Sequence, residues 1–298
     1  MPRPDRGSTA AGFRVQLLAR LRNEARSANI TAARLQQRVA FERLLTRLAG
    51  TDEWMLKGGF ALELRYGWQS RPTRDIDLRH STDSRQALQR LRLLLAQAAT
   101  TDPFQFELGD DEQELQGAPG GAVRIRVIAR LAGVVFADFH LDMSSGDAVS
   151  APPDILVGSG LLDFAGMRPL RFPTYPVVQH LAEKLHAYTL PRAEVNTRTK
   201  DLVDLVMFAL TEMVDGDLLT SSVQATFDAR LTHSLPPDFP EPPRIWSVAF
   251  ARLAAPVPLL AALALTDAYR IAAAFWDPVL DRGVAGQRWV PGTRVWVG

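Results

Sequence analysis

Residues 57–78 read KGGFALELRYGWQSRPTRDIDL, a segment that opens on a lysine and two glycines and closes on two aspartates separated by one isoleucine. Alternate side chains of a strand share a face, so we expect Asp75 and Asp77 to project together while Ile76 points into the core. Adjacent carboxylates repel each other unless a cation lies between them, and they suit octahedral Mg²⁺ carrying a nucleotide triphosphate. The segment therefore predicts a site for a nucleotide and a metal ion.

Lysine is rare in the rest of the chain. Of 34 basic residues only three are lysines, Lys57, Lys184 and Lys200, and the others are arginines. A lysine is a compact charge on a flexible stem that can reach a phosphate without the fork of a guanidinium. Lys57 opens the glycine motif and the other two fall in one later block. We therefore expect at least two of the three to contact nucleotide. The alternative is that their placement is accidental and Lys200 is simply solvated.

Composition limits the class of protein. The 298 residues are 47% hydrophobic, which is enough for one large or two ordinary domains, and the net charge of +1 means that a polyanion must be held by a local basic surface. The absence of cysteine excludes disulfides and thiolate metal sites and fits a reducing cytoplasm. No apolar run has the length of a signal peptide or membrane span, so we expect a cytoplasmic protein without membrane contact.

Upstream of the motif, helical spacing predicts helices over residues 11–28 and 31–48, the second capped by Thr31. The second helix carries arginines around its other side. We interpret them as a solvated face, with RNA contact as the alternative. These arginines are Arg34, Arg38, Arg43 and Arg47.

Within and downstream of the motif, the pattern predicts a strand over 54–56, a helix over 60–66, a strand over 75–78, a helix over 84–99 and a strand over 104–108. A hairpin follows, with strands over 123–130 and 134–143 and its turn at residues 132–133. Its second strand places three polar residues on one face, which a purely structural sheet has little reason to do. A third metal-binding carboxylate is expected from this set, which comprises Asp138, His140 and Asp142.

Residues 152–153 and the loop over 167–176 mark a boundary, and beyond it helices are predicted over 177–190, 200–212, 218–230 and 259–276, with a last strand within 288–298. Lys184 lies at the edge of a buried helical face, from which it can reach a ligand or remain a surface lysine. Asp201 and Asp204 share a helical face. Because the helix dipole accounts for Asp201, the site role goes to Asp204.

At this point the chain resembles a known family. Residues 57–78, together with residues 183–187 (EKLHA) and 200–205 (KDLVDL), resemble motifs of the AbiEii/AbiGii toxin-type nucleotidyltransferases, including the MenT toxins, over roughly residues 35–210. The resemblance implies an α+β, bilobed nucleotidyltransferase of the DNA polymerase β type. Its mixed sheet lobe with N-terminal helices would span 1–165 and its mainly helical lobe 166–298.

The resemblance also implies a reaction: transfer of NMP from an NTP with Mg²⁺ to an RNA acceptor, above all the 3′ end of tRNA, by a toxin that has a cognate antitoxin. Asp75 and Asp77 would hold the metal, with Asp142 as third acid and Asp138 as its fallback. Lys184 would contact the triphosphate and Asp204 would complete the site. The predicted nucleotide-binding set is Lys57, Gly58, Gly59, Arg71, Thr73 and Lys184.

Several alternatives remain open from sequence. The same acids could modify a small molecule such as an antibiotic, or a protein, including the chain itself at Thr73. Arg74 and His80 match a loose spacing found in some RNases, and an inactive RNA-binding module is a further option. Arg74, Arg124 and Arg126 are additional candidates for phosphate contact, and His140 and His186 are interpreted as structural or solvent-facing.

Overall fold

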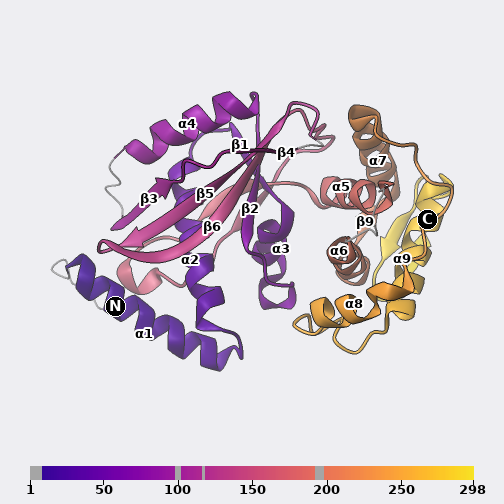
Figure 1. Cartoon of the computed structure of the whole chain (residues 1–298). Coiled ribbons are helices and arrows are strands. Elements are labelled where there is room, and N and C mark those ends of the chain that lie inside the picture. The colour runs from indigo at the N-terminus through magenta and orange to yellow at the C-terminus, as the bar shows by residue number, and fades with distance from the viewer. Residues whose placement is uncertain (1–8, 98–101, 116–117, 192–197) are drawn as a thin grey trace. The chain divides into compact units, whose positions relative to one another are not determined.

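The computed structural model describes the chain except residues 1–8, 98–101, 116–117 and 192–197 (Figure 1). Its internal contacts define two compact units. The first consists of Met1–Arg65, Thr73–Gly146 and Ile155–Thr174, and the second of Tyr66–Pro72, Asp147–Asp154 and Tyr175–Gly298. The division into a sheet lobe over 1–165 and a mainly helical lobe over 166–298 stays a prediction.

The first unit is built on a mixed sheet with the strand order β3-β5-β6-β2-β1-β8-β7, and β4 pairs with β5. The β2–β6 and β1–β8 pairs are parallel, whereas β1–β2, β3–β5, β4–β5 and β5–β6 are antiparallel. The predicted α+β class with a mixed sheet is therefore confirmed. The strands are β1 (Trp54–Lys57), β2 (Asp75–His80), β3 (Phe104–Leu108), β4 (Gln113–Leu115), β5 (Ala122–Leu131), β6 (Val134–Ser144), β7 (Asp154–Val157) and β8 (Arg171–Thr174).

One face of this sheet is apolar and packs against helices. Ile125, Val127 and Leu141 are fully buried, and α2 and α4 contact β6 (Figure 1). Residues at the alternate positions of β5 and β6 are more exposed, so the predicted polar face is confirmed. The helices of the unit are α1 (Ala10–Ser27), α2 (Ala32–Leu48), α3 (Gly58–Tyr66, whose last residue is assigned to the second unit) and α4 (Ser84–Ala96), with a short 3₁₀ turn η2 (Asp163–Ala165).

Local signals account for several boundaries in this unit. The Thr31 side chain accepts a hydrogen bond from the Arg34 amide and caps α2, as predicted. Ala132 and Gly133 both have positive φ, which is the geometry of a two-residue hairpin turn. The strand β8 lies in the segment expected to be a loop, and β4 and β7 lie where no strand was predicted. They are short, at three or four residues each, and carry little alternation of their own.

The arginines of α2 are not a solvated face, and that interpretation is wrong. Arg38 and Arg43 are only 6% and 4% exposed. Arg34 pairs with Glu63 at 3.1 Å, Arg38 with Glu42 at 3.0 Å, and Arg43 and Arg47 with Asp102. Because these buried charges are paired with acids of the same unit, they belong to its interior and cannot serve as an RNA surface.

The second unit is mainly helical, with a small sheet of order β11-β10-β9. The indole of Trp289, on β10, donates to the carbonyl of Ala209 on α6 at 2.8 Å and ties the sheet to the helices. The elements are α5 (Val177–Thr189), α6 (Thr199–Thr211), β9 (Val214–Asp215), α7 (Gly216–Arg230), α8 (Ser247–Ala254), α9 (Leu265–Leu280), β10 (Arg288–Val290) and β11 (Val295–Val297), with short 3₁₀ turns η1 (Gly67–Gln69) and η3 (Arg244–Trp246).

Two predictions for this unit need correction. The helix expected over 259–276 begins at Leu265, because the chain after Pro256 and Pro258 first forms a series of turns. The single strand expected near the C-terminus is a hairpin, β10 and β11, that also pairs with β9. No helix in the described part of the chain is long and apolar enough to cross a membrane.

Candidate active site

The glycine turn lies directly against the acidic strand. β1 ends at Lys57 and α3 begins at Gly58, which has a φ of +66°. A Cβ atom on Gly58 would lie 1.9 Å from Oδ2 of Asp77, so no residue with a side chain fits there without displacing that carboxylate. The backbone of the turn and the Asp77 carboxylate are therefore packed together.

Strand register gathers charged residues into one row across four strands. Lys57 on β1 is paired with Asp77 on β2, Asp77 with Asp142 on β6, and Asp142 with Arg124 on β5. Asp75, two residues before Asp77 on the same face of β2, is paired with His140. The row defined by Lys57, Asp77, Asp142 and Arg124 is called the charged row below.

Register also separates the two candidates for the third acid. Asp142 lies beside Asp77, whereas Asp138 lies beyond the end of β2, whose first residue, Asp75, is already opposite His140. Asp138 forms an ion pair with Arg126, and hydrogen bonds from that guanidinium lower the pKa of Asp138. Each acid is held by an arginine, so it is the register that favours Asp142 over Asp138 as the acid nearest the paired carboxylates.

Asp142 is nevertheless engaged by a cation of the protein. Arg124 donates from Nε and Nη2 to the two carboxylate oxygens of Asp142, each at 2.7 Å, in the fork geometry that makes such pairs strong. Its Nη2 also lies 3.9 Å from Oδ2 of Asp75. These hydrogen bonds raise the pKa of Arg124 further above its usual value.

The donor set suits a metal ion that arrives with a nucleotide. In the described residues no group of three His, Cys, Asp or Glu side chains is arranged to hold a metal by itself. Asp75 and Asp77 project from one face of β2, and Asp75 is 39% exposed, so both supply carboxylate oxygens at the surface of the sheet. Mg²⁺ is commonly bound by one or two carboxylates together with phosphates and water, which these residues fit.

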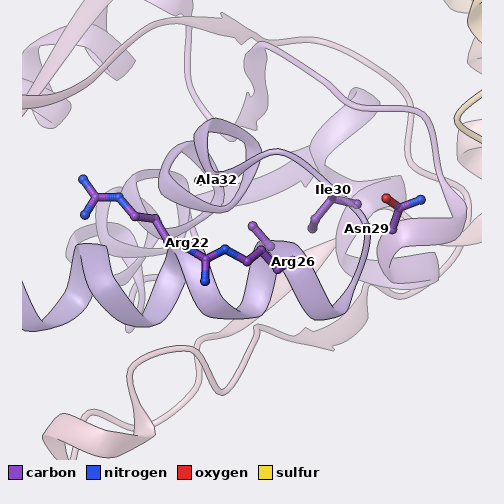
Figure 2. A pocket seen from close by; sticks show the side chains of 6 residues that line it. Arg22, Arg26, Asn29, Ile30 and Ala32 are labelled. Atoms are coloured by element: carbon purple, nitrogen blue, oxygen red, sulfur yellow. The ribbon is translucent and has the colours of Figure 1, made fainter.

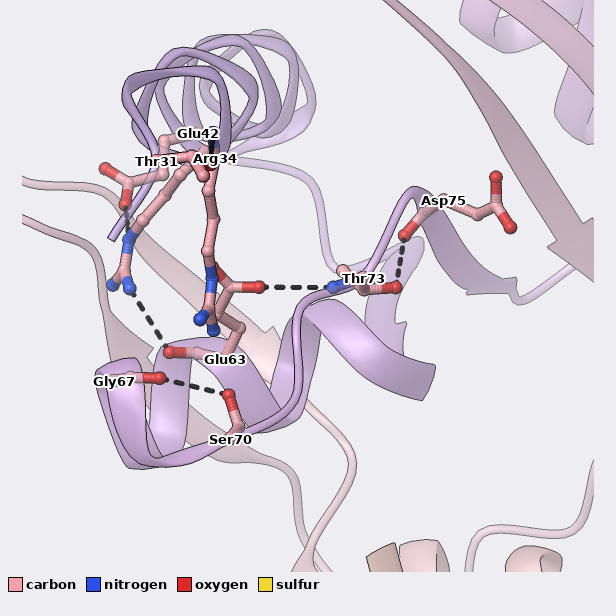
Figure 3. Close-up of polar contacts among 9 residues, drawn as sticks. Thr31, Arg34, Glu42, Glu63, Gly67, Ser70, Thr73 and Asp75 are labelled. Atoms are coloured by element: carbon pink, nitrogen blue, oxygen red, sulfur yellow. Dashed lines mark hydrogen bonds and ion pairs between the residues drawn. The ribbon is translucent and has the colours of Figure 1, made fainter. Parts of the chain in front are cut away.

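Thr73 is fixed just before the acidic strand by a residue that the sequence analysis missed. Its amide donates to Oε2 of Glu63 at 3.4 Å, and its hydroxyl donates to the carbonyl of Asp75 at 3.4 Å (Figure 3). Glu63 is 2% exposed and also accepts from Arg34, although burial raises its pKa. In sequence Glu63 is one acid within a short helix, and only its depth in the fold reveals its role.

A second cluster of candidate residues lies within the second unit, around Asp204. Arg71 donates to both oxygens of this carboxylate, from Nε at 2.9 Å and from Nη2 at 2.8 Å, and Nζ of Lys184 donates to Oδ2 at 2.5 Å. Asp201 lies 3.5 Å from Lys184 and 3.6 Å from Arg198. The structure thus brings together three predicted site residues, Arg71, Lys184 and Asp204, and adds Asp201, which was set aside.

The burial of this cluster decides what its members can do. Asp204 has no exposed surface and Lys184 is 8% exposed, so the surface-lysine alternative for Lys184 is wrong. Burial alone would raise the pKa of Asp204, but Arg71 and Lys184 hold it below its ordinary value. Asp204 is therefore an anion that positions two cations. Lys200, by contrast, is exposed.

The histidines fit structural or solvent-facing roles. His186 is buried against Phe227 and bonds to Thr232 at 2.7 Å, and burial, with Arg230 and His233, lowers its pKa to about 3. His140 is 47% exposed and lies 3.9 Å from Asp75. Asp75, Asp77 and Asp142 belong to the first unit and Lys184 and Asp204 to the second, so the convergence of the two sets on one nucleotide stays a prediction.

A surface hollow of about 500 Å³ lies where α1 ends and α2 begins (Figure 2). None of the predicted site residues lines it, so it is separate from the charged row. The exposed side chains of Arg22 and Arg26 border it together with Asn29. Unlike the arginines of α2, Arg22 and Arg26 form no ion pair with any described residue.

A mixed sheet in which a glycine turn packs on a strand with paired carboxylates defines the nucleotidyltransferase class of protein. The family model "Nucleotidyl transferase AbiEii toxin, Type IV TA system" matches residues 40–274. The chain belongs to this family and is an NTP-dependent nucleotidyltransferase of the toxin type. The match extends well past residue 210, so most of the C-terminal helices also belong to the family fold.

One solved structure agrees with this assignment at the level of the fold. The chain is similar to MenT4, the nucleotidyltransferase toxin Rv2826c from Mycobacterium tuberculosis H37Rv, with 19% identity, a TM-score of 0.52, and coverage of 90% of this chain and 94% of that one. A nucleotidyltransferase candidate from H. pylori is 15% identical with a TM-score of 0.44, over 85% of this chain and 98% of that one. None of the curated proteins compared matches the chain.

Proposed function

We propose that the chain transfers NMP from an NTP to a hydroxyl of an RNA acceptor, the 3′ end of tRNA above all, and that the reaction uses Mg²⁺. The observation that carries this proposal is the packing of the Gly58 turn against Asp77, because it puts backbone amides and a carboxylate pair at one place. Membership of a type IV toxin–antitoxin family adds an antitoxin as partner.

In the reaction, the acceptor hydroxyl attacks the α-phosphorus in line. A bond forms between the acceptor oxygen and phosphorus, the bond to the bridging oxygen of the β-phosphate breaks, and pyrophosphate leaves while the hydroxyl proton passes to water. A bound Mg²⁺ would neutralise charge that develops on the phosphate oxygens. Asp75 and Asp77 would hold it, with Asp142 as third acid.

The remaining residues act on the triphosphate. Lys57 and the amides of Gly58 and Gly59 lie at the start of α3, where a helix N-terminus favours phosphate. Lys184 would offset triphosphate charge, with Asp204 holding both its ammonium group and the Arg71 guanidinium in place. This part of the proposal requires the cluster around Asp204 to face the same nucleotide as Asp75.

The acceptor would be held by arginines that the fold leaves available. Arg22 and Arg26 on α1 are exposed, border the hollow at the α1–α2 junction and face solvent (Figure 2). Their guanidinium groups can each take a backbone phosphate, and this contact carries no sequence information. The α2 arginines cannot do so because they are buried in ion pairs.

The experiment is transfer of label from each of the four α-³²P NTPs, with Mg²⁺, in the presence of total tRNA, an aminoglycoside, or the protein alone. Label on tRNA is expected, and it should be lost in Asp75→Ala but kept in Glu107→Ala, which removes an exposed carboxylate paired with Arg130 elsewhere on the sheet. Label only on the aminoglycoside or on the protein would replace the RNA acceptor, and no label at all would reject the proposal.

A further inference from the structure

Arg124 is the only charged side chain of β5 that contacts the acids beside the glycine turn, within the residues the structure describes. Its Nε and Nη2 groups, which form one edge of the guanidinium, both donate to Asp142 at 2.7 Å, and Nη2 also lies 3.9 Å from Oδ2 of Asp75. It is 33% exposed, so the guanidinium lies at the surface of the sheet and remains reachable by a ligand. A protein cation therefore occupies the edge of the place where a divalent cation would bind.

Two cations at one group of carboxylates repel each other. A divalent ion held by Asp75 and Asp77 would have Arg124 as its neighbour, and it would share Asp142 with a guanidinium that already uses both oxygens. A nucleotide triphosphate changes this balance, because its several negative charges attract the ion and the guanidinium together. Arg124 thus disfavours the ion alone and favours the ion with a nucleotide.

We propose that Arg124 makes divalent-metal binding depend on the nucleotide: it weakens binding of the free ion to the acids of the charged row and strengthens binding of the ion–triphosphate complex. The inference rests on the proposed function and adds a rule for the order of binding at the same site. It also assigns Asp142 the task of positioning Arg124, whether or not Asp142 itself contacts the ion.

The same strand offers a matched control. Arg126, two residues further along β5 and on the same face, pairs with Asp138 in the same manner, from Nε to Oδ1 at 2.9 Å and from Nη2 to Oδ2. Asp138 lies beyond the end of β2, so this pair is displaced along the sheet from Asp75 and Asp77. Removing Arg126 deletes the same kind of ion pair without touching the charged row.

The test is binding of Mn²⁺, measured by electron paramagnetic resonance of the free ion, to the full chain with and without an NTP analogue that has a methylene between its α- and β-phosphates. The wild type should bind Mn²⁺ weakly alone and at least tenfold more tightly with the analogue. Arg124→Gln should bind free Mn²⁺ at least tenfold more tightly than the wild type and lose most of the gain from the analogue. Arg126→Gln should behave as the wild type.

Arg124→Lys separates charge from the fork geometry, and it should keep weak binding of the free ion. Thermal melts establish whether each variant is folded. If Arg124→Gln is not folded, the comparison of Arg124→Lys with the wild type is used. Free-ion affinity that is equal in the wild type and Arg124→Gln, or that rises equally in Arg126→Gln, would overturn the inference. A wild type that binds no Mn²⁺ even with the analogue would instead reject the proposed function.

Discussion

The Cβ position of Gly58 and the carboxylate of Asp77 occupy the same space: a side chain on Gly58 would begin 1.9 Å from Oδ2 of Asp77. Gly58 begins α3 directly after β1, Asp77 is the third residue of β2, and Lys57, just before Gly58, is the register partner of Asp77. The backbone conformation of the turn and the position of the Asp77 carboxylate therefore both require a glycine at residue 58.

Gly58→Ala should disable the enzyme through Asp77. Alanine at a φ of +66° costs about 1–2 kcal/mol of folding free energy, and the clash with Asp77 adds to it. Gly67→Ala is the matched control, because Gly67 has a φ of +61° but nothing within 4 Å of its Cβ position. Denaturant unfolding should show a loss of stability in both variants that is larger in Gly58→Ala, and NMP transfer should be lost only in Gly58→Ala. Equal activity of the two would contradict the role of this contact.

Asp204→Asn should destabilise the second unit. Removing one partner from a buried ion pair typically costs about 3–5 kcal/mol, since the other charges stay buried without compensation. Asp204 has a folded pKa below its ordinary value, so its contribution to stability is complete above the unfolded pKa of about 4 and declines as the pH falls through the folded pKa.

The measurement is urea unfolding of the wild type and Asp204→Asn at pH 7 and at decreasing pH below 4. The difference in unfolding free energy should be largest at pH 7 and shrink in acid. Asp201→Asn, which lies further from Lys184, should lose less. A neutral effect of Asp204→Asn at pH 7 would show that Arg71 and Lys184 do not depend on this carboxylate.

His186 should remain neutral throughout the physiological range. Burial and the nearby Arg230 and His233 lower its pKa to about 3, so folding opposes its protonation. Its effect on stability is therefore absent above the unfolded value of about 6.5 and becomes destabilising as the pH falls from there toward 3. Histidine NMR resonances report this directly: His186 should not titrate between pH 8 and pH 5. A midpoint near 6 would place the ring in contact with water.

Arg22→Ala combined with Arg26→Ala should weaken RNA binding evenly across RNA sequences. Each phosphate contact contributes about 0.7–0.9 to the slope of log affinity against log salt, so the double variant should lower the slope by about 1.5. Arg85→Ala is the control, because Arg85 is also exposed but pairs with Glu114. An unchanged slope, or lost binding of the antitoxin with RNA binding intact, would assign this surface to another partner.

Much of the fold was predictable because its signals are local. The strand–glycine–helix unit, the hairpin with its turn at Ala132 and Gly133, and most helices follow from periods of 2 and 3.6 residues and from turn residues. Short elements such as β4, β7 and β8 escaped prediction. Their three or four residues have too little pattern, and partner strands hold them in place.

Side-chain environment was less predictable. The pattern of the α2 arginines is typical of a solvated face. In the structure Arg34 and Arg47 instead form ion pairs with acids from distant segments, Glu63 and Asp102. Arg71 and Lys184 were expected to contact phosphate. In the structure both donate hydrogen bonds to the buried carboxylate of Asp204.

The sequence by itself determined the two aspartates on one face of β2, the glycines ahead of them and the polar side of the hairpin, because strand alternation fixes side-chain direction without reference to any other segment. Only the tertiary structure decided that Asp142 lies beside Asp77 and under the fork of Arg124, and that Asp204 is sealed between two cations. Those relations depend on strand register and helix packing between residues far apart in the chain, which no local pattern encodes.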